Sequence, residues 1–389
     1  MPVKIWVPLL GITLSAFVFN TSEYMPIGLL SDIAADFGMT EAACGMIVSV
    51  YAWAVMILSL PLMLLASRMA PKKLLIGVIV LFGACQLASA ASVSFEMLTA
   101  ARLGVAAAHA VFWSIATPIA VRIVPARKSS LAVSMVGMGT SVAMIFGLPA
   151  GRMLGLAIGW RCTFLVVGIA SLAIAACLTA VFPKLDAGKP FTVAKLPGLL
   201  RTRPLVGIYV TTVVAIIAYF TGYGFIEPFF AQVALMTDGE ITFALVLFGV
   251  AGLAGSLLFA RLGSVGLPTF VKIAVGGLAL SLLLMGPGAA LGAPASCLVC
   301  VIWGISASLF NVSFNAAVIK CSPAGASSVA TSIYSGLYNL GIGTGTWLGG
   351  VVTSTVGIGS IGYVGGVIAL AGFAYVCLRF VGLLRGVKS

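Results

Sequence analysis

Residues 162–182 read CTFLVVGIASLAIAACLTAVF, a run without a charged side chain. An α-helix rises about 1.5 Å per residue, so about twenty such residues cross the roughly 30 Å hydrocarbon core of a bilayer. The strands of a membrane barrel need only about ten residues of alternating polarity, and this run does not alternate. The segment therefore predicts a membrane-spanning helix.

Runs of this kind make up most of the chain. Of its 389 residues, 61% are hydrophobic and 8% are charged, whereas roughly a quarter of the residues of a soluble domain are charged. Inside a bilayer every backbone N–H and C=O must be paired within its own segment or in a closed barrel. The sequence thus predicts an all-α membrane protein with twelve transmembrane helices, near residues 5–31, 43–66, 73–91, 96–122, 129–157, 162–182, 204–233, 240–261, 270–288, 295–321, 326–356 and 361–384.

The predicted helices divide into two groups of six. The longest polar segment, residues 183–203, is interpreted as a cytoplasmic linker between an N-terminal half (1–182) and a C-terminal half (204–389). Glycine crowds the fifth span of one half and the eleventh span, its counterpart, in the other. Two similar halves with a binding site between them near the membrane midplane are typical of alternating-access carriers.

Basic residues are unevenly distributed between the loops. Eighteen of the 21 Lys and Arg residues lie on the side of the termini and the linker, and Arg161 alone lies in a loop on the other side. The positive-inside rule then places both termini in the cytoplasm. Topology accounts for the net charge of +12, so this charge does not indicate nucleic-acid binding.

Four stretches resemble the major facilitator superfamily, and within it the drug:proton antiporter branch and the bacterial SotB-like sugar efflux transporters. They are NTSEYMPIGLLSDIA at residues 20–34, AHAVFWS at 108–114, GLPAGR at 147–152 and YGFIEP at 223–228. The resemblance covers nearly the whole chain. It implies the major facilitator fold, location in a bacterial inner membrane, and export of sugars or sugar-like compounds in exchange for protons.

The same resemblance points to gating residues, with one departure from the family pattern. The loop after the second span usually reads G-x-x-x-D-R-x-G-R-K, but here Ser67 replaces the acid, which leaves Arg68 without its local partner. The candidate gating residues from the resemblance are Arg68, Gly147, Pro149, Gly151 and Arg152. Pro228 is a further candidate, because it removes a backbone donor near Gly222 and Gly224 and so predicts a discontinuity in the seventh span.

Three titratable residues are candidates for proton coupling. Glu23 and Glu227 are the only acids well inside the predicted spans, and His109 is the only histidine. An ionisable group in the bilayer interior is costly, so its presence suggests a cavity, a partner or a coupling role. A structural ion pair remains the alternative for Glu23, an interfacial position for Glu227, and a structural hydrogen bond for His109.

The candidate substrate-binding residues are polar or aromatic side chains within the spans. Arg102, His109 and Trp113 share one face of the fourth span, and Tyr219, Tyr223 and Glu227 follow at intervals of four in the seventh. Arg102 is a candidate counter-ion for Glu23 or a clamp on the substrate. The asparagines may instead join neighbouring helices. The full set is Asn20, Glu23, Arg102, His109, Trp113, Tyr219, Tyr223, Glu227, Asn311, Asn315, Tyr334, Tyr338 and Asn339.

No motif indicates a cofactor, a metal or an enzyme. Cys297 and Cys300 form a lone C-x-x-C without a second pair, and the glycines at 341–345 lie within a span, where close helix packing explains them. The expected partners are a small-molecule substrate, protons and the lipid bilayer, and the chain is expected to act as a monomer. An exporter of drugs, antibiotics or nucleosides is the main alternative, and the sequence alone also allows a proton-linked importer or a uniporter.

Overall fold

The computed structural model describes residues 3–66, 69–183, 185, 202–262, 266–323 and 327–385. Within these ranges the chain is helical and contains no strand, which confirms the predicted all-α class. The described residues fall into two compact units, one within Met1–Phe37 and Val50–Phe191 and the other within Gly38–Ser49 and Thr192–Ser389. The boundaries 1–182, 183–203 and 204–389 stay a prediction, and Arg68 and most of the linker lie outside the described residues.

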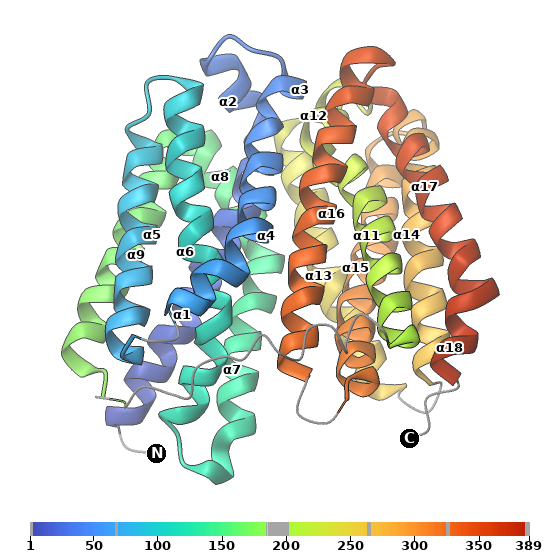
Figure 1. The fold of residues 1–389 in the computed structure, drawn as a ribbon. Coiled ribbons are helices and arrows are strands. Elements are labelled where there is room, and N and C mark those ends of the chain that lie inside the picture. The colour runs from blue at the N-terminus through green and yellow to red at the C-terminus, as the bar shows by residue number, and fades with distance from the viewer. Residues whose placement is uncertain are drawn as a thin grey trace. The chain divides into compact units, whose positions relative to one another are not determined.

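The first unit consists of antiparallel helices joined by short loops (Figure 1). Helix α5 packs against α6 and α9, and α1 packs against α7, α8 and α9. The elements are α1 (Val3–Gly28), α2 (Leu30–Asp36), most of α4 (Met46–Ala66), α5 (Pro71–Ala90), α6 (Phe95–Arg122), the 3-10 turn η1 (Ala126–Lys128), α7 (Ser129–Val142), the π-helical segment η2 (Ala143–Gly147), α8 (Leu148–Ile158) and α9 (Trp160–Val181).

The second unit repeats this packing. Helix α14 contacts α15 and α17, as α5 contacts α6 and α9, and α11 contacts α16 and α17, as α1 contacts α7 and α9. The elements are α3 (Glu41–Cys44), α11 (Arg203–Tyr223), α12 (Ile226–Gln232), α13 (Asp238–Arg261), α14 (Leu267–Ala290), α15 (Ala293–Cys321), α16 (Ser327–Thr355), the 3-10 turn η5 (Ile358–Ser360), α17 (Ile361–Tyr375), the π-helical segment η6 (Val376–Phe380) and α18 (Val381–Arg385).

Eleven helical segments among the described residues are long and apolar enough to cross a membrane. Helix α16 is a further segment of 29 residues, rich in Ser, Thr and Gly and without charge. In α9, which contains the quoted run, Leu165, Val166 and Ile169 are 40%, 43% and 55% exposed. Apolar side chains that point outward suit a helix in contact with lipid, because lipid tails are as apolar as these side chains.

Two predicted helices are interrupted where the sequence suggested continuous spans. The first span breaks at Leu29, which has non-helical dihedrals and follows Pro26 and Gly28. In the fifth span the α-helical pattern widens to the π segment η2 just before Pro149. Proline removes a backbone donor and crowds the preceding turn, which is where the π segment lies before Pro149. The break at Leu29 directly follows Gly28, and glycine is a weak helix former.

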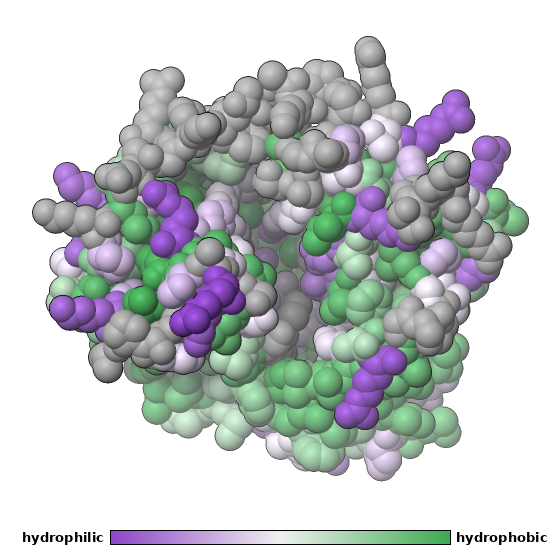
Figure 2. Space-filling model, turned by 90° about the horizontal axis from the view of Figure 1, so that it is seen from below, coloured by the Kyte–Doolittle hydropathy of each residue, from purple (hydrophilic) through white to green (hydrophobic). Residues whose placement is uncertain are grey.

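In α6 and α13 the helix ends carry charged residues, acids at the first turn and an arginine at the last. Helix α13 has Asp238 and Glu240 in its first turn and Arg261 in its last, and α6 begins with Glu96 and ends with Arg122. Figure 2 shows hydrophilic side chains at the ends seen from below and hydrophobic ones on the flanks of the helices. This distribution within each unit agrees with helices that span a bilayer.

Thiol labelling tests the predicted orientation. Because Glu96 and Lys128 lie near opposite ends of α6, single cysteines at these positions, in a background without the eight native cysteines, should react from opposite sides of the membrane. We expect an impermeant maleimide to label the Glu96→Cys variant in intact cells and the Lys128→Cys variant only after the membrane is opened. Labelling of both variants in intact cells would contradict the orientation.

The glycines of α16 allow its close approach to α11. A Cβ atom at Gly341 would lie 2.7 Å from Ile216 side-chain atoms, at Gly345 2.5 Å from the Ile217 carbonyl oxygen, and at Gly349 2.6 Å from the Thr221 carbonyl oxygen. Spaced four apart, these glycines lie along one face of the helix. Close helix packing therefore explains the repeat, as the sequence indicated.

We predict that Gly345→Ala lowers the thermal unfolding midpoint in detergent by several degrees, because its Cβ would overlap a backbone carbonyl that cannot rotate away. Gly336→Ala is the matched control, since nothing lies within 4 Å of a Cβ there, and helix propensity favours alanine over glycine by about 1 kcal/mol. Equal midpoints for the two variants would show that the α11–α16 contact does not limit stability.

Candidate functional site

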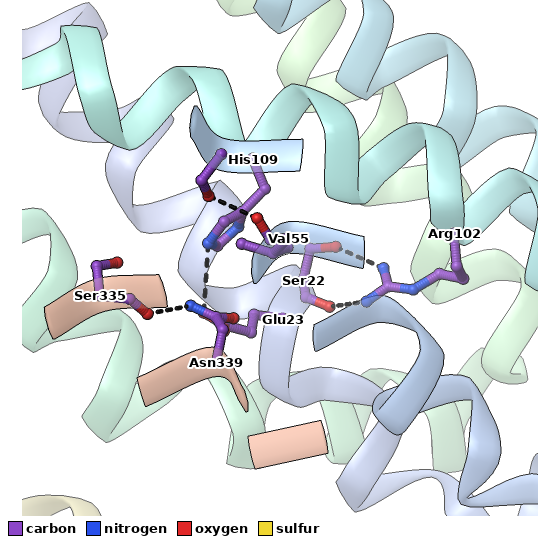
Figure 3. A network of polar contacts seen from close by, with 8 residues as sticks. Ser22, Glu23, Val55, Arg102, His109, Ser335 and Asn339 are labelled. Carbon is purple, nitrogen blue, oxygen red and sulfur yellow. Dashed lines mark hydrogen bonds and ion pairs between the residues drawn. The ribbon is translucent and has the colours of Figure 1, made fainter. Parts of the chain in front are cut away.

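Glu23 lies in α1, six residues before the break at Leu29. Its side chain is 8% exposed. His109 reaches it from α6, with 3.8 Å between His109 Nε2 and the nearer Glu23 oxygen, and is equally well buried (Figure 3). The structure thus brings together two residues that the sequence proposed separately for proton coupling. At this distance a change of protonation on one affects the other, because few water molecules can screen them.

Aromatic rings from α4 and α6 lie next to His109. The Tyr51 ring lies edge-on with its centroid 5.7 Å away, and the Trp113 ring is at 5.9 Å. His109 Nδ1 is buried and has no hydrogen-bond partner among the described residues. The histidine therefore has one nitrogen near a carboxylate and the other without a partner in the described part of the chain.

Arg102 is buried in α6, two turns before His109, and hydrogen-bonds to the residue next to Glu23. Its Nη1 donates to Ser22 Oγ at 2.9 Å and its Nη2 to the Ser22 carbonyl oxygen at 3.0 Å (Figure 3). The guanidinium lies over the Tyr51 ring, 4.5 Å from the centroid. These contacts hold Arg102 against α1, beside Glu23. Its role as a counter-ion for Glu23 or as a clamp on the substrate stays a prediction.

Two polar residues of this network were not found by sequence reasoning. Ser22 accepts from Arg102 and also from the amide of Gln86 on α5. Gln86 is fully buried. A lone amide in an otherwise apolar stretch of α5 was the available signal, but the sequence does not show which helix faces it. Together, Ser22, Gln86 and Arg102 join α1, α5 and α6.

The predicted gating residues of the fifth span lie against α1. A Cβ at Gly147 would lie 2.6 Å from Thr21 Oγ1, and one at Gly151 would lie 2.7 Å from Met25 Cγ. Arg152 is buried, and its Nη1 donates to the Gly28 carbonyl oxygen at 2.9 Å. Pro149 lies in the first turn of α8, after the π segment. The gating role of these residues stays a prediction.

In the second unit the seventh span is also discontinuous, as its Gly and Pro residues suggested. Helix α11 ends at Tyr223, and α12 begins at Ile226 after the non-helical Phe225. Glu227 and Pro228 lie in the first turn of α12 and are buried. The Tyr219 and Tyr223 rings stack at 4.9 Å and both contact Trp303 of α15, which the sequence analysis did not single out.

The remaining substrate candidates differ in whether their polar atoms are already bonded. Asn315 Nδ2 donates to the carbonyl and side-chain oxygens of Asn311 within α15. Asn339 Nδ2 donates to the Ser335 carbonyl oxygen, but its Oδ1 has no partner in the described chain. Tyr334 also has a buried hydroxyl without a partner there, and its ring lies 6.0 Å from that of Tyr338. Asn20 is buried in α1.

Comparison with known proteins places these features in a family. The family model of the Major Facilitator Superfamily matches residues 12–343. A bacterial homologue of the human lysosomal transporter Spinster is similar over 100% of this chain and 99% of its own, with 15% identity and a TM-score of 0.79.

Two other solved structures share the fold. A D-xylose–proton symporter is similar over 98% of this chain and 99% of its own, at 14% identity and a TM-score of 0.78. The human organic anion transporter MFSD10 is similar over 97% of this chain and 100% of its own, at 16% identity and a TM-score of 0.71. The predicted major facilitator fold is confirmed, and the protein is a transporter of small molecules, not an enzyme. The chain belongs to the major facilitator superfamily.

Proposed function

We propose that this chain is a proton-coupled antiporter that exports sugars or sugar-like compounds by alternating access. The observation that carries the coupling is the buried pair of Glu23 and His109, 3.8 Å apart in the first unit. An acid within a membrane-spanning helix is costly and is typical of proton relays and coupling sites. A carboxylate that gains and loses a proton during the cycle would favour different conformations in its two states.

Arg102 supports this assignment through its fixed position. Its guanidinium cannot lose its proton at physiological pH and is held on Ser22, beside Glu23. A permanent cation near a titrating carboxylate stabilises the anion, so the acid can release its proton even though it is buried. Glu227 is the second acid that could contribute, since it is also buried within a spanning segment.

The substrate class and the direction of transport rest on other observations. The resemblance of residues 20–34 and 147–152 to sugar efflux transporters supports export of sugars. Unpartnered amide and hydroxyl oxygens on α16, at Asn339 and Tyr334, suit a ligand rich in hydroxyl groups. The basic helix ends support cytoplasmic termini in a bacterial inner membrane, and we propose a monomer as the working unit.

An exporter of apolar drugs or antibiotics is the second candidate. The aromatic side chains of α11 and α15, with Tyr219, Tyr223 and Trp303 in mutual contact, favour it because flat apolar compounds pack well on aromatic rings. Transport of a labelled thiogalactoside by the purified protein in liposomes, in competition with an apolar antibiotic, separates the two candidates.

We predict that Glu23→Gln abolishes uptake driven by an imposed pH gradient in liposomes that contain inverted protein, since glutamine keeps the shape but cannot exchange a proton. Ligand binding should remain measurable and vary less with pH than in the unchanged protein. Glu23→Asp should keep partial activity because it retains the carboxyl group. Glu96→Gln, at an exposed acid in the first turn of α6, is the control. Near-normal gradient-driven uptake by Glu23→Gln would exclude Glu23 as the coupling acid.

The hydrogen bonds of Arg102 to Ser22 lead to a second prediction, on transport rate and stability. Lysine keeps the charge but cannot donate to Ser22 Oγ and the Ser22 carbonyl oxygen from a planar fork or stack equally well on Tyr51. We expect Arg102→Lys to slow transport roughly tenfold, which corresponds to about 1.4 kcal/mol, and to lower the thermal midpoint. Arg127→Lys, at an exposed arginine, should change neither quantity. A fully active Arg102→Lys variant would show that charge alone suffices there.

A further inference from the structure

Gln86 belongs to the buried network around Ser22, but the proposed function does not use it. It is the only side-chain amide of α5 and is fully buried. Its Nε2 donates to Ser22 Oγ, whereas its Oε1 has no hydrogen-bond partner among the described residues. A buried amide with an unmade hydrogen bond is costly compared with an apolar side chain of similar size. Stability alone therefore does not explain an amide at this position.

The Ser22 hydroxyl is bonded differently from that of Ser15, two turns earlier in α1. Ser15 donates to the carbonyl oxygen of Gly11, four residues before it in the same helix. Ser22 Oγ instead accepts from Gln86 on α5 and from Arg102 on α6. A hydroxyl oxygen has two lone pairs, so these two donors use its full capacity as an acceptor. A turn of the side chain toward its own helix would move the oxygen away from both.

Packing on two sides of Gln86 limits where its amide can point. One turn earlier in α5, the Phe82 ring stacks on Phe19 of α1, with centroids 3.8 Å apart. On the α9 side, a Cβ at Gly168 would lie 3.2 Å from Gln86 Cβ and 3.2 Å from the Gly83 carbonyl oxygen. The glycine at 168 thus allows a close approach of α5 and α9. The stem of Gln86 is held between α1 and α9, and its amide reaches Ser22.

Arg102 depends on Ser22 for its position. In the part of the chain that the structure describes, its hydrogen bonds both go to this serine, from Nη1 to the hydroxyl at 2.9 Å and from Nη2 to the carbonyl oxygen at 3.0 Å (Figure 3). The carbonyl is part of the α1 backbone and cannot turn, whereas the hydroxyl can rotate about the Cα–Cβ bond. The hydroxyl therefore needs a further group to hold it, and Gln86 is the other side chain bonded to it.

We propose that Gln86 is a positioning residue for proton coupling. Its amide keeps the Ser22 hydroxyl oriented as an acceptor for Arg102, and Arg102 is thereby held on α1 beside Glu23. A cation at a fixed place favours the anionic form of a neighbouring carboxylate each time the proton must leave, whereas a mobile cation does so less. In this role Gln86 neither touches the substrate nor exchanges a proton. The inference rests on the proposed function, in which Glu23 is the coupling acid.

Transport by the full-length protein in liposomes tests this role, with labelled methyl thiogalactoside as the probe. Gln86→Met keeps the length of the side chain but removes its donor. We expect it to lower the maximal rate of uptake driven by a pH gradient roughly tenfold, as the loss of one hydrogen bond to a charged network can, and to change KM less than about twofold. Exchange of labelled for unlabelled thiogalactoside without a gradient should stay within about twofold, because exchange needs no net release of protons.

The matched control is Ser89→Ala. It removes a buried hydroxyl from the same helix, but the hydrogen bond of this hydroxyl goes to the Cys85 carbonyl oxygen and stays within α5. It should change neither uptake nor exchange. The thermal midpoint of each variant verifies folding. Gln86→Asn, whose shorter stem leaves the amide out of reach of Ser22, should show the same loss of uptake and replaces Gln86→Met if that variant does not fold.

A double variant tests whether Gln86 acts through Ser22. Ser22→Ala removes the hydroxyl that both donors share and leaves the carbonyl oxygen for Arg102. If Gln86 acts only through this hydroxyl, adding Gln86→Met to Ser22→Ala should cause no further loss of gradient-driven uptake. The positioning role would be overturned by losses that multiply in the double variant, by normal uptake in Gln86→Met, or by an equal loss of uptake and exchange.

The behaviour of Glu23→Gln separates this inference from the proposed function. Near-normal gradient-driven uptake by Glu23→Gln, or no such uptake by the unchanged protein, would refute the proposed coupling and with it any positioning role in coupling. Abolished uptake by Glu23→Gln together with normal uptake by Gln86→Met would refute the positioning role alone.

Discussion

The bilayer offers no water to polar groups, so every donor and acceptor inside it needs a partner within the protein. Most hydroxyl groups meet this constraint within their own helix: Ser15 donates to the Gly11 carbonyl oxygen, Ser171 to that of Val167, and Thr211 to that of Gly207. Such bonds need no neighbouring helix. Arg102 cannot be satisfied in this way, because its fork of donors needs several acceptors. Its Nη1 and Nη2 find two of them on Ser22 of another helix, whereas its Nε has no partner among the described residues. The packing of α1, α5 and α6 around Ser22 therefore depends on one buried cation.

The difference between contacts within one helix and contacts between helices also explains how much could be predicted from the sequence. The helices follow from apolar runs and from charges at loop positions, which are local properties, and their bounds differ by few residues from those expected. The breaks at Leu29 and Phe225 lie near Pro and Gly residues that signal them. Ser22 and Gln86 were missed because their role depends on which helices meet, and a single sequence does not contain that information. The pairing of Glu23 with His109 was missed for the same reason, although each was named alone.

The two units repeat the same packing of helices, although the repeat is weak in their sequences. The contacts of α1 with α7 and α9 correspond to those of α11 with α16 and α17. Each unit also contains a long helix, a break and then a helix of 7 residues, α2 in one and α12 in the other. A buried acid lies close to each break, Glu23 before it and Glu227 after it. Breaks of this kind are typical of gating helices in transporters built from repeats.

The two units share an architecture, but their buried side chains differ in chemistry. The buried network of the first unit contains Glu23, Arg102 and His109, all able to carry charge, whereas the second contains a group of neutral aromatic side chains in mutual contact, Tyr219, Tyr223 and Trp303. An uncharged substrate would not compete with a proton for the Glu23 carboxylate, nor would it repel one. Under the proposed function, coupling must then act through conformation: protonation of Glu23 and ligand binding each favour one state, and by linkage each changes the affinity for the other by the same factor, typically about 5- to 150-fold. A neutral substrate is thus compatible with proton antiport if protonation of Glu23 and ligand binding bias the same conformational change.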